Sequence, residues 1–240
     1  MALTENLSRL TGYTPRRADP DDPAAVLAMP LVLHLPKADP PPRAAVLEAA
    51  ARATVLACLD PRAAAGGEWA DAFDAWCAGR IRKIARRARG ASWAAVDQVP
   101  GITVDAGGAQ ARACVPGPVG ATDRRIAKLQ IGGTEVPGDL STERPAPGTL
   151  GLWVAPDLPM TVGKLAAQVS HASMLGAPLL ARDRLAGWYD DGCPLAVRQA
   201  TRARWAELLA AEEAGTAIAV RDAGYTEVTP GSCTVIAEVA

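Results

Sequence analysis

Three polar side chains are spaced to share one face of a helix, where they could act together on a substrate. Lys164, Gln168 and His171 lie at positions i, i+4 and i+7, and a rotation of about 100° per residue brings them to the same side. An ammonium stabilises an oxyanion or holds a phosphate, and an amide both donates and accepts hydrogen bonds. A lysine in the first turn of a helix is electrostatically unfavourable, so Lys164 predicts a nearby anion.

Asp222 is the candidate for that anion. It follows the apolar stretch 216–221, which predicts a strand, and open α/β sheets bind their ligands at the carboxyl ends of strands. A carboxylate facing Lys164 would fix the ammonium and help to position an attacking water molecule. We therefore expect Lys164 and Asp222 to face each other across a shared crevice.

These residue types also have plainer interpretations. A lysine and a glutamine suit an ordinary solvated helix face, a histidine suits a structural role, and an aspartate suits a turn cap. Thr226 and Ser232 follow Asp222 in the sequence, and their hydroxyls suit either contacts with a substrate backbone or the formation of turns.

The segments that must position these residues predict an α/β fold. The apolar run 150–155 is typical of a strand buried on both faces, and a short loop joins it to the helix that carries Lys164. The other segments predict helices over 43–59, 69–78, 178–190 and 202–213, and strands over 31–35, 101–105, 110–115, 125–131, 193–199, 216–221 and 233–239. Segment 80–89 suits either type. This order indicates a three-layer α/β/α architecture with a small mixed sheet.

Three ordered segments resemble the signature motifs of the class II (archaeal and eukaryotic type) peptidyl-tRNA hydrolases. They are 160–172, 220–226 and 229–235, with the sequences MTVGKLAAQVSHA, VRDAGYT and TPGSCTV. The resemblance covers about residues 149–240. It implies a hydrolase that cleaves the ester between tRNA and a peptide or another N-blocked aminoacyl group, with peptidyl-tRNA as its partner and no metal or organic cofactor.

The resemblance also implies roles for individual residues. The catalytic residues would be Lys164, Gln168 and Asp222, and the supporting or substrate-binding residues would be Gly163, His171, Thr226 and Ser232. Water would be the nucleophile, because no serine or cysteine lies in the context of a nucleophile elbow.

The sequence departs from the family at positions that affect charge. Family members usually carry arginine at Ala155, lysine at Val162, lysine near Leu195 and glutamine at Glu227. We therefore expect weaker tRNA binding, unless the basic segment 80–89 compensates; its alternative role is a solvated face. The candidate tRNA contacts are Arg80, Arg82, Lys83, Arg86, Arg87 and Arg198.

The two halves of the chain look alike, which indicates a duplicated fold. We expect a loosely held tail over 1–25, a degenerate copy over 26–133, a linker over 134–148 and the catalytic lobe over 149–240. At the positions of Gly163, Lys164, Gln168 and His171, the first copy has Ala45, Val46, Ala50 and Ala53. Because family members are generally homodimers, we expect two tandem lobes that form an intramolecular pseudo-dimer with one inert lobe.

Composition limits the alternatives. A net charge of −1 argues against broad nucleic-acid affinity, so any RNA contact needs a local patch. Five scattered cysteines and two histidines do not suggest a zinc site, and their pattern favours a reducing cytoplasm. No long uncharged apolar stretch predicts a membrane span.

Two other functions remain open at this stage. The chain could be a tRNA-binding protein whose site no longer turns over, which would explain the missing basic positions. It could also be an ester-cleaving or acyl-transfer enzyme that acts on a different carrier.

Overall fold

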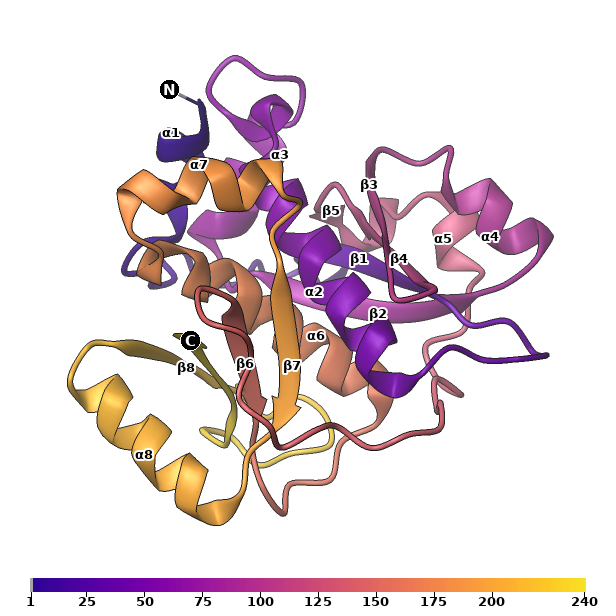
Figure 1. Cartoon of the computed structure of the whole chain (residues 1–240). Coiled ribbons are helices and arrows are strands. Elements are labelled where there is room, and N and C mark those ends of the chain that lie inside the picture. Colours follow the sequence, from indigo (N-terminus) through magenta and orange to yellow (C-terminus); the bar gives the residue numbers. More distant parts are fainter. Residues whose placement is uncertain (1) are drawn as a thin grey trace.

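A computed structural model describes residues 2–240. The strands form two separate β-sheets, each with a row of four neighbouring strands (Figure 1). The first sheet has the order β2-β1-β4-β3, with the short β5 paired to β1. The second sheet has the order β7-β6-β9-β8. We call the elements from β1 to α5 the first lobe and those from β6 to β9 the second lobe.

The elements of the first lobe follow one another closely along the chain. They are β1 (Leu27–His34), α2 (Arg43–Leu59), α3 (Ala70–Ala78), β2 (Arg82–Ala88), α4 (Ala91–Val96), β3 (Gly101–Ala106), β4 (Ala109–Cys114), β5 (Gly117–Pro118) and α5 (Arg124–Ala127). Short 3₁₀ turns occur at Pro23–Ala25, Pro61–Ala63 and Val119–Ala121. The ambiguous basic segment is therefore a strand over most of its length.

The second lobe repeats this order of elements. They are β6 (Leu150–Val154), α6 (Val162–Gly176), α7 (Arg182–Asp190), β7 (Leu195–Gln199), α8 (Arg202–Glu213), β8 (Ala217–Arg221) and β9 (Cys233–Val239), with a 3₁₀ turn at Ala177–Leu179. In each lobe the first strand runs parallel to the second strand and antiparallel to the fourth. The third and fourth strands form an antiparallel hairpin in both lobes.

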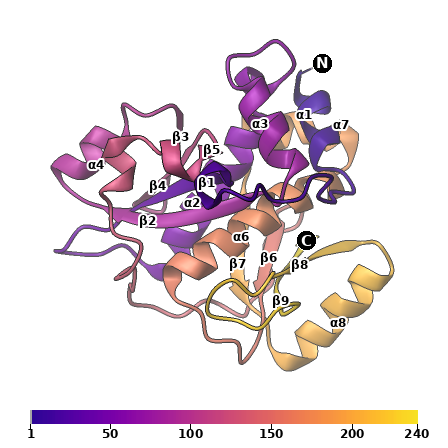
Figure 2. The same cartoon turned by 180° about the vertical axis from the view of Figure 1, so that it is seen from behind.

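Helices α2 and α6 lie against each other between the two sheets, as the view from behind also shows (Figure 2). Small side chains allow this approach: Ser170 Oγ donates to Ala50 O at 3.2 Å, and Ser173 Oγ donates to Ala51 O at 2.8 Å. Gly176 lets α6 approach its own sheet, because an added Cβ would lie 2.6 Å from Ala237 Cβ. The core therefore runs through both lobes without interruption.

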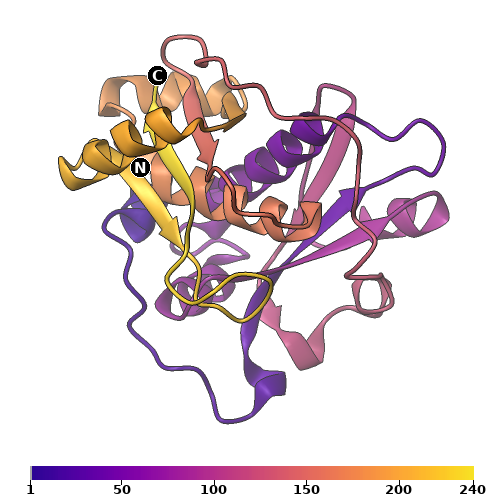
Figure 3. The same ribbon diagram turned by 90° about the horizontal axis from the view of Figure 1, so that it is seen from below.

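The outer face of each sheet is covered as well. In the first lobe, Val32 of the sheet packs with Val96 and Ile126 from α4 and α5. In the second lobe, Trp153 and Ile236 pack under Leu208 of α8. The expected α/β fold with three layers is confirmed for each lobe, and Figure 3 shows the two sheets on either side of the inner helices. No helix among residues 2–240 is long and apolar enough to cross a membrane.

The beginning of the chain differs from the loosely held tail expected over residues 1–25. Helix α1 (Ala2–Leu10) packs on the first lobe, where Leu10 is buried and Asn6 Nδ2 donates to Asp60 O at 2.9 Å. The physical reason is an apolar stripe of Leu3, Leu7 and Leu10 at helical spacing, which packs onto the core. Residue 1 lies outside the described part of the chain.

The strand expected over 125–131 was wrong. Asp123 caps a short helix there, α5, by accepting a hydrogen bond from Arg125 N at 2.7 Å, and aspartate is a favoured cap. Only Gln130 pairs with a strand, through an isolated bridge to Arg87. The segment 132–149, most of which was expected as a linker, contains no helix or strand.

The close contact of α2 and α6 makes the stability of the protein sensitive to side-chain volume there. Ala50 is fully buried, so Ala50→Leu should lower the free energy of unfolding by about 1–3 kcal/mol, since overpacking displaces the neighbouring backbone. The exposed Ala206 on α8 offers a matched control, because Ala206→Leu adds the same volume to a solvated helix face. Urea unfolding of both variants measures the difference, and equal midpoints would contradict the tight packing of this interface.

Candidate functional site

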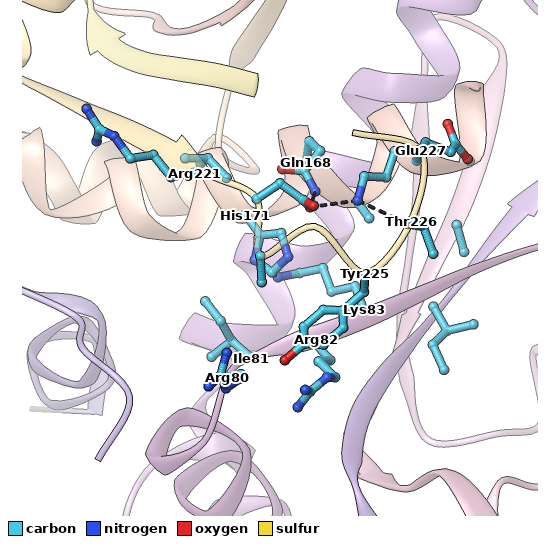
Figure 4. Close-up of a pocket in the computed structure, with 18 of the residues that line it drawn as sticks. Arg80, Ile81, Arg82, Lys83, Gln168, His171, Arg221, Tyr225, Thr226 and Glu227 are labelled. Carbon is cyan, nitrogen blue, oxygen red and sulfur yellow. Dashed lines mark hydrogen bonds and ion pairs between the residues drawn. The ribbon is translucent and has the colours of Figure 1, made fainter. Parts of the chain in front are cut away.

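A cleft of about 660 Å³ lies where the two lobes meet, and both lobes line it. The first lobe contributes residues 80–85 along β2, and the second contributes one face of α6 and the loop after β8. Figure 4 shows these two walls and the polar side chains between them. The two large hydrophobic side chains that are most exposed, Ile131 and Tyr225, also line this cleft.

The expected pairing of Lys164 and Asp222 is confirmed at one end of the cleft. Lys164 Nζ lies 2.6 Å from Asp222 Oδ2, and the two side chains are only 9% and 10% exposed. Lys164 Nζ also donates to Thr226 Oγ1 at 3.1 Å, and Gln168 Nε2 donates to Asp222 Oδ2 at 2.9 Å. The carboxylate thus explains why a lysine is tolerated in the first turn of α6.

The loop after β8 holds the Asp222 carboxylate in place through its own backbone. Gly224 N donates to Asp222 Oδ1 at 2.8 Å, an arrangement typical of an Asx turn. Gly224 has φ +78°, and an added Cβ would lie 2.3 Å from Pro230 Cγ, so this position requires glycine. The main chain of Asp222 is fixed by hydrogen bonds to Ser232 O at 2.9 Å and from Gly231 N at 2.7 Å.

The amino end of α6 is fixed from three sides. Thr161 caps the helix by accepting a hydrogen bond from Lys164 N, and the Glu227 carboxylate accepts from Thr161 N at 2.9 Å and from Thr161 Oγ1 at 2.8 Å. The anionic Glu227 therefore lies where the helix dipole favours negative charge. Gly163 N donates to the buried Thr134 Oγ1 at 2.9 Å, which ties the segment between the lobes to the site.

The Gln168 amide has a defined orientation. Its Oε1 accepts a hydrogen bond from Thr234 Oγ1 at 2.6 Å, so its Nε2 faces Asp222. Thr234 Oγ1 also lies 3.2 Å from Val220 O, and Thr234 is fully buried in β9. The orientation of the Gln168 amide is therefore set by the hydroxyl of Thr234, a residue that was not among the site residues expected from the sequence.

His171 lies two turns along α6 and contacts the first lobe. Lys83 Nζ lies 3.0 Å from His171 Nδ1. Burial holds the pKa of His171 well below its ordinary value, and the charges of Lys83 and Lys164 act in the same direction. Burial also lowers the pKa of Lys83, to about 7. The imidazole is accordingly neutral at physiological pH.

The basic residues expected to contact tRNA have different surroundings. Arg82 makes two hydrogen bonds to Asp19, at 2.5 and 2.7 Å, and Arg80 lies 3.4 Å from the same carboxylate. The hydrogen bond from Arg82 lowers the pKa of Asp19, so the carboxylate stays charged and offsets part of the positive charge of both arginines.

The other basic candidates lie away from the cleft surface or turn inward. Arg86 donates to Leu129 O at 2.8 Å, Arg87 donates to Gln130 Oε1, and Arg198 lies 3.5 Å from Glu48 Oε1. None of these three lines the cleft. Lys83 lines it, but its ammonium is directed at His171. Ser232 does not line the cleft either, and its hydroxyl lies 2.9 Å from that of Thr229.

Sequence reasoning missed the residues that hold the site from a distance. Three side chains form hydrogen bonds to residues of α6 or its cap from other parts of the chain: Thr134, Thr234 and Glu227. Thr234 lies within the third motif, which is the one signal that pointed toward it. Thr134 had no comparable signal, because its partner Gly163 lies far away in sequence.

The arrangement suits the cleavage of an activated carbonyl by water. The Lys164 ammonium and the Gln168 amide both donate to the Asp222 carboxylate, and the Thr226 hydroxyl accepts from the same ammonium. No cysteine or serine is among the residues that line the cleft, and within residues 2–240 no three His, Cys, Asp or Glu side chains gather in a way that could hold a metal ion. The site can therefore stabilise a developing oxyanion and orient a water molecule.

Comparisons with known proteins match the second lobe. The family model of peptidyl-tRNA hydrolase PTH2 matches residues 149–238. A peptidyl-tRNA hydrolase of Thermococcus sibiricus is 34% identical over 90 residues, which make up 35% of this chain and 76% of that relative. The matched segment contains Lys164, Gln168 and Asp222 together with the loop that follows β8.

The hydrogen bond from Thr234 should be essential for the orientation of Gln168. Thr234→Val keeps the shape but leaves Gln168 Oε1 without its donor, so the free energy of unfolding should fall by about 1–3 kcal/mol. Thr4→Val, at an exposed position of α1, is the control and should change the free energy by about 0.5 kcal/mol or less. Chemical unfolding measures both, and an unchanged Thr234→Val variant would show that the amide needs no such support.

Proposed function

Since the chain belongs to the PTH2 family of peptidyl-tRNA hydrolases, we propose that it hydrolyses the ester bond between tRNA and a peptide or another N-blocked aminoacyl group. The observation that carries this proposal is the pair of Lys164 and Asp222, joined at 2.6 Å at the mouth of a cleft. Gln168 and Thr226 complete the polar group around that pair.

The proposed chemistry is attack of water on the ester carbonyl. A new bond forms between the water oxygen and the carbonyl carbon, and the bond from that carbon to the ribose oxygen of tRNA breaks. One proton of the water passes to the leaving ribose oxygen, and the peptide leaves as a carboxylic acid. The energetic demand is greatest at the tetrahedral stage, where the carbonyl oxygen becomes negative.

Lys164 is suited to that demand because its ammonium is held at a fixed position in a poorly solvated site. An ammonium there stabilises an oxyanion more strongly than one in water does. Asp222 holds the ammonium and has one further acceptor direction for water. Its position is fixed by hydrogen bonds from Lys164 Nζ, Gln168 Nε2 and Gly224 N.

We also propose that the first lobe is a degenerate copy whose role is support. Both lobes follow the same strand order and the same sequence of elements. In the first lobe Gly107 and Gly108 alone join β3 to β4, whereas residues 222–232 join β8 to β9. The first lobe therefore has no counterpart of the loop that carries Asp222 and Thr226, and the two lobes form one asymmetric pseudo-dimer with a single site.

Hydrolysis of N-acetyl-aminoacyl-tRNA tests the proposed function. Lys164→Ala and Asp222→Ala should each lower kcat/KM by about 10²–10³-fold, and the double variant should lose little more, since the two residues act as a unit. The exposed Lys128 supplies a control, Lys128→Ala, which should retain activity. If the wild-type protein binds this tRNA and leaves the ester intact, the chain is a tRNA-binding protein and the enzymatic proposal is wrong.

Arg80 and Arg82 are the basic residues best placed to contact the tRNA, because they line the cleft. Replacing both by glutamine should weaken tRNA binding and reduce the steepness of log K against log salt by about 1–2. Each phosphate contact releases counterions from the tRNA when it forms, and the double variant would form fewer contacts. Asp19→Asn should act in the opposite direction, because it frees both arginines from their shared carboxylate.

Arg202→Gln serves as the control for this experiment, because Arg202 is 84% exposed on α8 and does not line the cleft. Binding measured from 50 to 200 mM salt for all four proteins gives the slopes. The contact is refuted by a double variant whose affinity and slope equal those of the wild type.

A further inference from the structure

The second half of the cleft contains a pair of basic groups that the proposed chemistry does not use. Lys83 comes from β2 in the first lobe and His171 from α6 in the second, and Figure 4 shows the lysine end beside the imidazole ring. Their nitrogens are 3.0 Å apart. The contact joins the two lobes inside the cleft.

The Lys83 ammonium contacts three protein groups. Besides His171 Nδ1 it contacts Met174 Sδ at 3.2 Å, and it lies 4.9 Å from the centre of the Trp76 ring. A cation above an aromatic face is attracted by the ring. The main polar partner of Lys83 is therefore the histidine.

Below a pH of about 7, where Lys83 is an ammonium, this contact decides which nitrogen of His171 carries the proton. An ammonium has only donors, so Nδ1 accepts through its lone pair, and the proton of the neutral ring is then on Nε2. Nε2 has no hydrogen-bond partner among residues 2–240, while His171 lines the cleft. The ring thus presents one unused N–H donor to whatever occupies the cleft.

The distance from the reaction centre identifies the part of a substrate that meets this donor. His171 follows Lys164 by seven residues of helix, which corresponds to about 10 Å along the axis, or about three residues of an extended peptide. The cleft that His171 lines also has apolar side chains in its walls, among them Ile81, Leu175 and Val220. A neutral donor among apolar side chains suits a peptide carbonyl rather than a phosphate.

We propose that His171 and Lys83 form a subsite for the peptide part of the substrate. His171 Nε2–H donates to a backbone carbonyl about two or three residues from the ester, and Lys83 is the positioning residue that holds the imidazole in this tautomer. The subsite rests on the proposed hydrolysis of peptidyl-tRNA, and it gives the first lobe a direct part in substrate recognition.

The tautomer of His171 can be measured by NMR without any substrate turnover. Assignment of the imidazole signals is simple because the chain has only two histidines. In long-range ¹H–¹⁵N spectra at pH 6, His171 should carry its proton on Nε2 in the wild type and in Lys83→Arg, and should show mixed tautomers in Lys83→Met. His34→Gln assigns the second ring. A His171 signal that is the same in Lys83→Met as in the wild type would overturn the positioning role.

The same spectra test the ligand. N-acetyl-trialanine, a product of the stated class, should shift the Nε2–H proton of the wild type, whereas N-acetyl-alanine should leave it almost unchanged because it is too short. Equal responses to both, or none to the tripeptide, would overturn the subsite. This readout stands even if the wild type hydrolyses no peptidyl-tRNA, a result that would reject the proposed function alone.

Kinetics then show whether the subsite contributes to turnover. On an N-acetyl-tripeptidyl-tRNA, His171→Ala and Lys83→Met should lose about tenfold in kcat/KM, the effect of one hydrogen bond, while Lys83→Arg should stay near the wild type. On N-acetyl-aminoacyl-tRNA, whose acyl group is too short to reach His171, the losses of His171→Ala and Lys83→Met should be smaller than on the tripeptidyl substrate. Equal losses on the long and the short substrate would show that the variants damage the fold or the reaction centre instead.

Discussion

One poorly solvated ion pair determines how the second lobe is arranged. Lys164 and Asp222 are each about one tenth exposed, so either charge without the other would be costly, by about 3–5 kcal/mol where burial is complete. The pair joins the first turn of α6 to the loop after β8. The supporting interactions, from Gln168, Thr226 and the backbone of Gly224, converge on these two groups. The same interactions also fix the positions of the groups that the proposed hydrolysis uses.

The first lobe supplies the opposite wall of the cleft rather than a second site. Lys83 and Leu195 occupy equivalent positions in the second strands of the two lobes. Each lies two residues before the residue that pairs with the centre of the first strand, in the pairs Ala85 with Leu31 and Val197 with Leu152. The two lobes therefore differ at equivalent positions of their second strands: one has a lysine that reaches His171, and the other has a leucine. A cation is therefore present at this position in the first lobe only, and it lines the cleft.

The sequence alone predicted the features that depend on local pattern. The bounds of α2, α8 and β9 agree with the expected ranges because their apolar periodicity and flanking residues are clear, and the motifs sufficed to pair Lys164 with Asp222. The rest depends on contacts between distant segments. Helix α1 gains its stability from the core of the first lobe, and the environment of Lys83 exists only because the lobes pack together. No local pattern encodes such contacts.

The hydrophobic core continues from α2 to α6, so the second lobe is not packed as an independent domain. The segment that matches known proteins ends at the boundary of the second lobe, but α6 is buried on one side by α2, whose carbonyl oxygens accept from Ser170 and Ser173. Cut free at residue 149, that segment would expose to water the face of α6 that α2 covers, and it would leave two serine hydroxyls without their acceptors. The family match covers the second lobe alone, whereas the packing of α2 on α6 makes the two lobes one structural unit.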